Sequence, residues 1–261
     1  MRIIFLTSES PHHFYLINEI HKEFPITKIF FQTRHLEHRS FTNRIKRLLS
    51  KKGLKTLPSN ILKEIILGRL RRKQYDYEVR AFFQGQKPFL KPEIPFEHVR
   101  SFNSESGIER IRKSEPDLAV VFGTDILKES VIRIPKLGIV NIHRAILPEY
   151  RGGGTDWWIC YNKDFEYLGC SIHHLVPDLD AGGIIVKRRY ELSPDDGIYT
   201  LRYKTTLISV ELLKETIRQF EAGCVNSEPQ VGGTLWRSKD LTVFKMLKAY
   251  KSFKRKIGML R

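Results

Sequence analysis

The chain has 261 residues, of which 41% are hydrophobic and 28% are charged, and its formal net charge is +16. This length suits one large α/β domain or a domain with an appendage, and no apolar run approaches the roughly 20 residues of a membrane-spanning helix. The three cysteines are too few and too irregularly spaced for a disulfide framework or a zinc site, whereas the positive charge favours anionic partners such as nucleotides, nucleic acid or a membrane surface.

The first elements predict the start of an α/β fold. Residues 2–7 form an apolar strand, residues 11–24 carry apolar side chains at helical spacing, and residues 26–32 form a second strand. No Gly-x-Gly-x-x-Gly turn and no Walker loop occurs, which disfavours a nicotinamide cofactor. The opening strand is too short for the apolar core of a signal peptide, so we expect a cytoplasmic protein.

Residues 34–95 interrupt this alternation. Helical patterns at residues 41–49 and 61–70 are interleaved with many arginines and lysines, and no strand is evident before Pro95. We interpret the segment as a basic helical insertion. Its simplest structure is a solvated helical hairpin, and the alternative is a binding site for an acidic substrate, nucleic acid or a membrane.

The alternation resumes with a strand at 96–102, a helix at 104–113 and a strongly apolar strand at 117–122. A further buried strand begins near residue 137, and Asn141 and His143 lie at its end. Residues two apart on a strand face the same way, so we expect both side chains to project from the carboxyl edge of the sheet. Open α/β sheets bind their ligands at that edge.

The next strand, at 167–176, leads into a loop that contains Asp180, and another apolar run follows at 184–186. If these strands are neighbours, Asp180 returns to Asn141 and His143. Such a set combines an amide donor for an oxyanion, a base that titrates near neutral pH, and a carboxylate that orients the base or a water. No thiol or hydroxyl nucleophile is required.

His173 and His174 raise the question of a metal site with the nearby aspartates. Adjacent strand residues face opposite ways, so we expect no metal there. One of the two imidazoles should support His143 or Asp180 through water, and the other should pack beneath a helix. The run Gly152 to Gly154 enters a helix, and we interpret it as a turn in preference to a phosphate site.

The C-terminal part of the chain is predicted to be helical. A long helix from about residue 196 to 220 should cover one face of the sheet, and a basic amphipathic helix follows at 241–257. The outer face of that last helix lies in water, on a membrane or against nucleic acid. We predict a catalytic domain at 1–235, with its insertion, and a basic helical extension at 236–261.

Three motifs together resemble the folate-dependent formyltransferases. They are Asn141-x-His143, Leu147-Pro148-x-Tyr150-Arg151-Gly152 and Leu179-Asp180-x-Gly182-Gly183. The resemblance covers about residues 117–222, and it departs from the family at Arg144 and Ala145, where many members carry Pro and Ser. It implies an α/β, Rossmann-like fold with a mostly parallel sheet flanked by helices, here with the basic insertion and a short C-terminal helical extension.

The same resemblance implies that the chain is an enzyme whose co-substrate is 10-formyltetrahydrofolate and whose acceptor is a primary amine. It assigns Asn141, His143 and Asp180 to catalysis and leaves the division of acid and base roles between the last two open. Loops at the sheet edge of relatives hold the pterin ring. The corresponding cofactor-binding candidates are Thr124, Asp125, Leu127, Val176, Pro177 and Asp178.

Members of the family that use different acceptors also differ in the segments around the shared core. Relatives that formylate initiator methionyl-tRNA carry a C-terminal barrel domain, and those of purine synthesis are shorter and lack the insertion. We therefore expect a nucleotide-linked amino sugar, as in surface polysaccharide synthesis. One alternative is formylation of glycinamide ribonucleotide or of methionyl-tRNA. A second is hydrolysis of formyltetrahydrofolate, although hydrolases carry an amino-terminal regulatory domain. A third is that the protein is not an enzyme and binds nucleic acid or membranes. We expect no stable nucleic-acid partner, allow a weak anionic-membrane contact, and leave a homodimer open.

Overall fold

The computed structural model describes residues 1–33 and 57–261. Its central sheet has seven strands in the order β3-β2-β1-β4-β5-β7-β8. The first five strands of this order are parallel to one another. Strand β7 is antiparallel to β5, and β8 is antiparallel to β7. This confirms the mostly parallel, Rossmann-like sheet. The strands are β1 (Ile3–Thr7), β2 (Ile26–Gln32), β3 (Phe96–Val99), β4 (Leu118–Phe122), β5 (Gly138–His143), β7 (Gly169–His174) and β8 (Ile184–Arg189).

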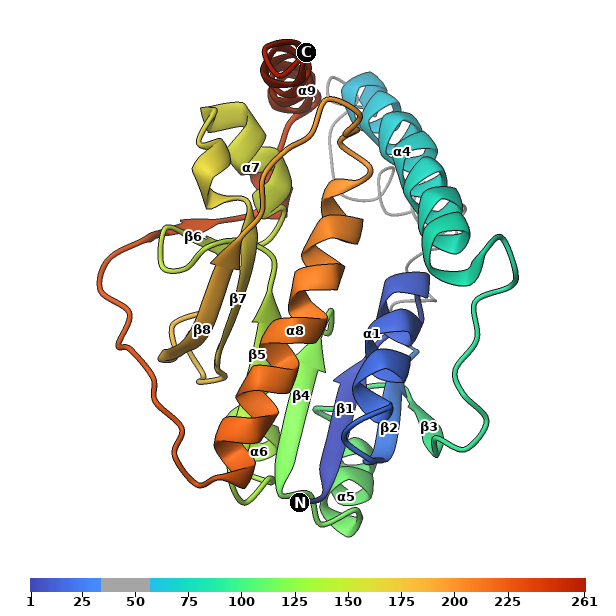
Figure 1. Cartoon of the computed structure of the whole chain (residues 1–261), viewed down its shortest axis with the longest axis vertical. Coiled ribbons are helices and arrows are strands. Elements are labelled where there is room, and N and C mark those ends of the chain that lie inside the picture. The colour runs from blue at the N-terminus through green and yellow to red at the C-terminus, as the bar shows by residue number, and fades with distance from the viewer. Residues whose placement is uncertain (34–56) are drawn as a thin grey trace.

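Helices cover both faces of this sheet, with α1 and α8 on one face and α5 and α6 on the other (Figure 1). Every residue of β1 and β4 is buried, as expected for central parallel strands between two helical layers. The helices are α1 (Pro11–His21), α4 (Leu57–Phe83), α5 (Glu105–Lys113), α6 (Glu129–Ile132), α7 (Thr155–Asn162), α8 (Leu201–Glu221) and α9 (Val243–Gly258), with short 3-10 turns at Phe165–Tyr167 and Ser238–Asp240.

Most predicted boundaries hold to within a few residues, but α4 continues to Phe83, well past the predicted end at residue 70, and α8 begins at Leu201 instead of about residue 196. The strand predicted at 96–102 ends at Val99, because the next residues form the turn that caps α5. The Ser104 hydroxyl accepts a hydrogen bond from the Gly107 amide at 3.1 Å, which is the usual role of serine at a helix start. The helical pattern predicted at 41–49 lies outside the described residues.

Helix α4 accounts for the helix predicted at 61–70, but it is not a solvated arm. It packs against α1 and α9. Its Glu78 is fully buried and receives two hydrogen bonds from Arg202 of α8, at 2.6 and 2.7 Å, while His12 Nδ1 of α1 lies 3.5 Å away. A buried carboxylate is tolerated only with such partners, so this ion pair fixes α4 to the body of the molecule.

Helix α9 packs on α7 and shares a core with it. Met246, Ala249 and Phe253 are buried in the same cluster as Trp158 and Ile159. Figure 1 shows α9 at the upper end of the molecule, beside α7 and the start of α4. The predicted division at residue 235 stays a prediction. Among the described residues, no helix combines the length and the apolar composition needed to cross a bilayer.

A two-stranded parallel sheet, which the sequence did not predict, closes one end of the main sheet. It pairs β6 (Tyr150–Gly152) with β9 (Thr234–Trp236). Gly152 has a φ of +92°, and an added Cβ would meet the Trp236 carbonyl oxygen at 2.1 Å, so only glycine fits there. This pairing holds the segment after β5 against the carboxyl edge of the main sheet.

Candidate active site

The sheet topology brings Asn141, His143 and Asp180 together. Asn141 and His143 end β5, and the antiparallel pairing with β7 sets Asn141 directly opposite His173. Opposite residues of an antiparallel pair share one face of the sheet, and the loop after β7 then carries Asp180 back to that face. The structure thus assembles the three side chains that the sequence singled out.

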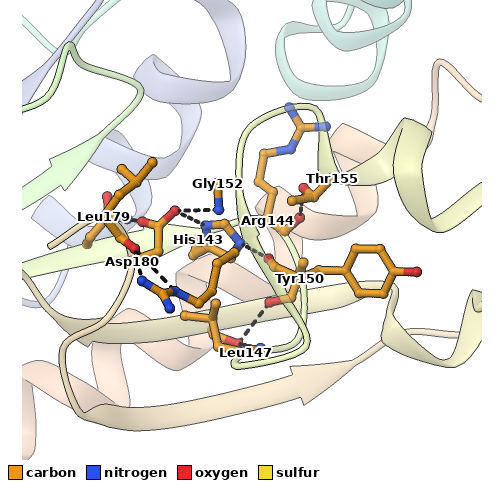
Figure 2. Close-up of polar contacts among 12 residues, drawn as sticks. His143, Arg144, Leu147, Tyr150, Gly152, Thr155, Leu179 and Asp180 are labelled. Atoms are coloured by element: carbon orange, nitrogen blue, oxygen red, sulfur yellow. Dashed lines mark hydrogen bonds and ion pairs between the residues drawn. The ribbon is translucent and has the colours of Figure 1, made fainter. Parts of the chain in front are cut away.

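Asp180 is the centre of the cluster. Its Oδ2 accepts a hydrogen bond from the Gly152 amide at 2.8 Å and lies 3.5 Å from His143 Nδ1 (Figure 2). Its Oδ1 accepts a hydrogen bond from Asn141 Nδ2 at 3.3 Å. Burial acts to raise the pKa of Asp180, but His143, His173 and the Gly152 amide together hold that pKa at about 2. The carboxylate is therefore ionised at neutral pH.

His143 is held at both ring nitrogens. Its Nε2 lies 2.6 Å from the Tyr150 carbonyl oxygen, so Nε2 carries a hydrogen and donates it, and Nδ1 faces Asp180. The side chain is only 6% exposed, and this burial lowers the pKa of His143 although Asp180 opposes the shift. At neutral pH the imidazole is consequently neutral, with a lone pair on Nδ1 that can accept a proton beside an ionised carboxylate.

His173 orients the amide of Asn141. Its Nδ1 donates to the His174 carbonyl oxygen at 2.8 Å, which leaves Nε2 as an acceptor 3.1 Å from Asn141 Nδ2. The same Nε2 lies 3.5 Å from Asp180 Oδ1, so His173 is the one of the two imidazoles that faces the cluster. His174 faces the other way and packs against Phe220 of α8, with 6.1 Å between ring centroids.

The cluster lies in a cleft of about 1220 Å³. Two loops form one wall, and they contain five of the six cofactor-binding candidates, namely Thr124, Asp125, Leu127, Val176 and Pro177. The sixth, Asp178, is exposed and is not among the lining residues. Gln32 fixes the first loop, because its side chain accepts from the Asp125 amide at 3.1 Å and donates to the Asp125 carboxylate at 2.9 Å.

A second part of the cleft lining, the basic wall, is rich in arginine; the sequence predicted a site for an acidic substrate in the basic insertion only as the alternative. The basic wall contains Arg71 and Arg72 of α4, Arg144 after β5, and Arg202 of α8. The guanidinium of Arg144 donates to Asp156, its Nε is buried with no partner, and burial lowers its pKa to about 10, which still leaves it protonated. A helical pattern alone does not say which arginines of α4 face a cleft.

The segment from residue 147 to 152 serves to position Asp180. The Arg151 guanidinium donates to the Leu179 carbonyl oxygen at 2.7 Å. Gly152 contributes the amide described above (Figure 2). The Gly152 amide therefore donates to the Asp180 carboxylate and is not free to bind a phosphate. This agrees with our interpretation of Gly152 to Gly154 as a turn.

Sequence comparison identifies the same region of the chain. The profile of the formyl transferase family matches residues 61–217, which is more than half of the chain. A methionyl-tRNA formyltransferase from Staphylococcus aureus (strain JH1) is 31% identical over 147 residues, covering 56% of this chain and 47% of the relative. The chain thus spans about half the length of such curated relatives.

Solved structures share the fold. A 4-N formyltransferase from Francisella tularensis superposes with a TM-score of 0.58 at 15% identity, covering 95% of this chain and 86% of that one. A sugar 3N-formyltransferase, solved in the presence of dTDP and 5-N-formyl-THF, gives a TM-score of 0.57 at 14% identity, covering 97% and 79%. At these identities the likeness concerns the fold alone. The profile match over residues 61–217 shows that the chain belongs to the formyl transferase family.

Proposed function

We propose that this protein transfers the formyl group of 10-formyltetrahydrofolate to a primary amine. The observation that carries the proposal is the placement of Asn141, a neutral His143 and an ionised Asp180 together in one large cleft. Family membership supports it. The cluster offers a hydrogen-bond donor, a proton acceptor and a fixed negative charge, which are the groups that acyl transfer to an amine requires.

The loop wall of the cleft suits the pterin ring of such a donor. Apolar side chains, including Val121, Leu127 and Val176, lie there beside the polar residues Thr124 and Asp125. A flat heteroaromatic ring needs this pairing of apolar surface with polar groups at its edge. When bound, the folate supplies the formyl carbon and a nitrogen leaving group.

The residues of the cluster divide the work as follows. The amine nitrogen bonds to the formyl carbon, the bond from that carbon to the folate nitrogen breaks, and one proton passes from the amine to the departing nitrogen. His143 accepts the proton at Nδ1, and Asp180 stabilises the imidazolium that results. The contact from Asn141 Nδ2 to Asp180 is long, at 3.3 Å, so this N–H can be shared with the formyl oxygen as negative charge develops there.

A nucleotide-linked amino sugar is the acceptor that best fits the basic wall. The exposed Arg71 and Arg72 of α4 line it, and guanidinium groups bind diphosphates well. Arg144 and Arg202 also line it, and their guanidinium groups already donate to Asp156 and Glu78. The sugar 3N-formyltransferase that shares this fold was solved with dTDP. The amino group of the sugar would then lie between the basic wall and the folate loops, next to His143.

Methionyl-tRNA is the second candidate acceptor. The curated relatives that match this chain include methionyl-tRNA formyltransferases, and the net charge of +16 also suits RNA. Only about half of each such relative is matched, so this match does not extend to the acceptor specificity of the whole relative.

The test is the release of tetrahydrofolate from 10-formyltetrahydrofolate in the presence of each acceptor. The panel contains nucleotide-linked 3-amino and 4-amino sugars, glycinamide ribonucleotide, methionyl-tRNA and no acceptor. We expect release only with an amino sugar, with a product heavier by one formyl group. Release without acceptor would indicate a hydrolase, release only with methionyl-tRNA the second candidate, and no release under any condition would contradict the proposed activity.

A further inference from the structure

Helix α9 has a composition that separates it from the other described helices. Its 16 residues include six lysines or arginines and no aspartate or glutamate. One face is apolar and buried, where Met246, Ala249, Phe253 and Ile257 join the core shared with α7. The buried inner face therefore accounts for the packing of α9 on the rest of the protein. The composition of the outer face is not explained by that packing.

The outer face carries a stripe of large apolar side chains. Phe244 is 73% exposed, Leu247 54% and Tyr250 43%. They are three residues apart, so they lie along one side of the helix. Lys251 and Lys254 are exposed and flank them one turn further along. We call these five residues the outer stripe of α9. Three large apolar side chains in a row are unfavourable in water, and such an exposed patch marks a surface that a partner covers.

Other lysines of α9 have a structural role. Lys245, Lys248 and Lys256 lie over the rings of Trp158, Tyr161 and Phe165, at 4.7, 4.8 and 5.9 Å from the ring centroids. These cation–π contacts attach one flank of α9 to α7 and the turn after it. The flank with the outer stripe is turned to solvent and combines positive charge with apolar bulk.

We propose that the outer stripe of α9 docks this protein on an anionic lipid surface. Aromatic and aliphatic side chains enter the boundary between headgroups and acyl chains, while lysines beside them bind lipid phosphates. Charge complementarity selects an anionic surface, because α9 contains no acidic residue. The exposed Phe244 and Leu247 favour lipid over nucleic acid, since phosphate backbones reward charge and not aliphatic side chains.

Helix α4 extends the same end of the molecule. It packs on α9, and its Leu62 and Ile65 are 49% and 42% exposed. Figure 1 shows α9 and the start of α4 together at one end, while α5 and α6 lie at the opposite end. Docking through this end leaves the side chains of His143 and Asp180 untouched, so lipid binding is separate from the proposed formyl transfer.

The experiment is sedimentation of the full chain with vesicles, either of phosphatidylcholine alone or of phosphatidylcholine with one third phosphatidylglycerol. We expect binding only to the anionic vesicles, and its loss at about 1 M NaCl, where screening acts over about 3 Å. Lys251→Gln with Lys254→Gln should lower the partition coefficient by about 25-fold, because each basic residue near an anionic surface contributes about fivefold. Phe244→Ser with Leu247→Ser should lower it by at least about tenfold.

Matched controls lie at the opposite end of the molecule. Lys113→Gln with Arg133→Gln removes the same charge from α5 and the end of α6, and Leu137→Ser removes an apolar side chain that is 49% exposed. These variants should bind as the native chain does, and all variants should keep the native thermal midpoint. Equal binding to neutral vesicles, equal losses in the controls, binding to RNA but not to vesicles, or no vesicle binding would each overturn the proposal.

Discussion

The two sides of the cleft are built differently. On the catalytic side, His143, Asp180 and His173 are almost fully buried, and each of them has at least two polar contacts within 3.5 Å. On the basic side, Arg71 and Arg72 are exposed residues of one helix. Chemistry at a formyl carbon needs groups held in one geometry, whereas long charged side chains can adjust to a phosphate.

The supports of the two sides differ as well. Paired strands in fixed register hold the catalytic side, since the β5 and β7 ladder sets Asn141 opposite His173. On the basic side, α4 is fastened by the buried ion pair of Glu78 with Arg202. We therefore expect substitutions on the catalytic side to lower turnover and those on the basic side to weaken acceptor binding.

The largest expected effect follows from truncating the buried pair. His143→Ala or Asp180→Ala should lower turnover by at least about a hundredfold, because positioned acid–base groups contribute about 10² to 10⁴. Initial rates of tetrahydrofolate release at saturating substrates measure this. Circular dichroism should show an unchanged fold, and near-native turnover in either variant would falsify the catalytic assignment.

Asn141→Ala should have the next largest effect. Loss of one oxyanion donor costs about 10² to 10³ in kcat, with little change in the KM of either substrate. A rise in KM at constant kcat would instead assign Asn141 to ground-state binding. Asn141→Asp is the matched variant: it keeps the shape, removes both N–H groups and adds a charge beside Asp180, so it should be no more active than the alanine variant.

Arg71→Gln with Arg72→Gln tests the basic side and should have a smaller effect. Exposed charge contacts are worth about 0.2 to 1 kcal/mol each, so we expect the KM of the acceptor to rise about three- to tenfold while kcat and the KM of the folate stay the same. The control is Arg69→Gln with Lys73→Gln, which removes the same charge from α4 at positions that do not line the cleft. Equal effects in the two pairs would mean that only the overall charge matters.

The same difference between the two sides explains what the sequence could predict. Asn141 and His143 end β5, and strand periodicity together with the carboxyl-edge rule is enough to place them. Asp180 lies in the loop after β7, which is antiparallel to β5, so its return to this pair follows from the neighbouring position of the two strands and not from that rule. The same alternation predicted that one of His173 and His174 faces the cluster, and it is His173, whose Nε2 lies 3.1 Å from Asn141 Nδ2.

The parts that escaped prediction depend on long-range pairing. The Gly152 amide reaches Asp180 because β6 pairs with β9, some eighty residues later in the chain, and a three-residue strand leaves no periodic signal. Likewise, the place of Arg71 in the cleft depends on the packing of α4, which is set by the burial of Glu78. A basic helix predicts a solvated charged face, and the packing of α4 decides that part of this exposed face lies over the cleft.

The smallest expected effect is a shift in pH dependence. Burial lowers the pKa of His143 from its ordinary value of 6.5, and catalysis needs the neutral imidazole, so activity should be constant down to about pH 6.5 and fall only on further acidification. Asp180 has a pKa of about 2 and stays ionised throughout this range. Because the charge of Asp180 raises the pKa of His143, Asp180→Asn should move the midpoint of the residual activity to lower pH.

The acceptor amine also titrates, and comparison of the two profiles separates it from His143. Protonation of the amine is the same with the native enzyme and with the Asp180→Asn variant, so it cannot shift the midpoint between them. Profiles of kcat/KM for the acceptor between pH 5 and 8 measure the difference. If the activities of the two enzymes fall at the same pH, the fall reports protonation of the acceptor amine. If the activity of the variant falls at a higher pH than that of the native enzyme, Asp180 does not stabilise a protonated His143.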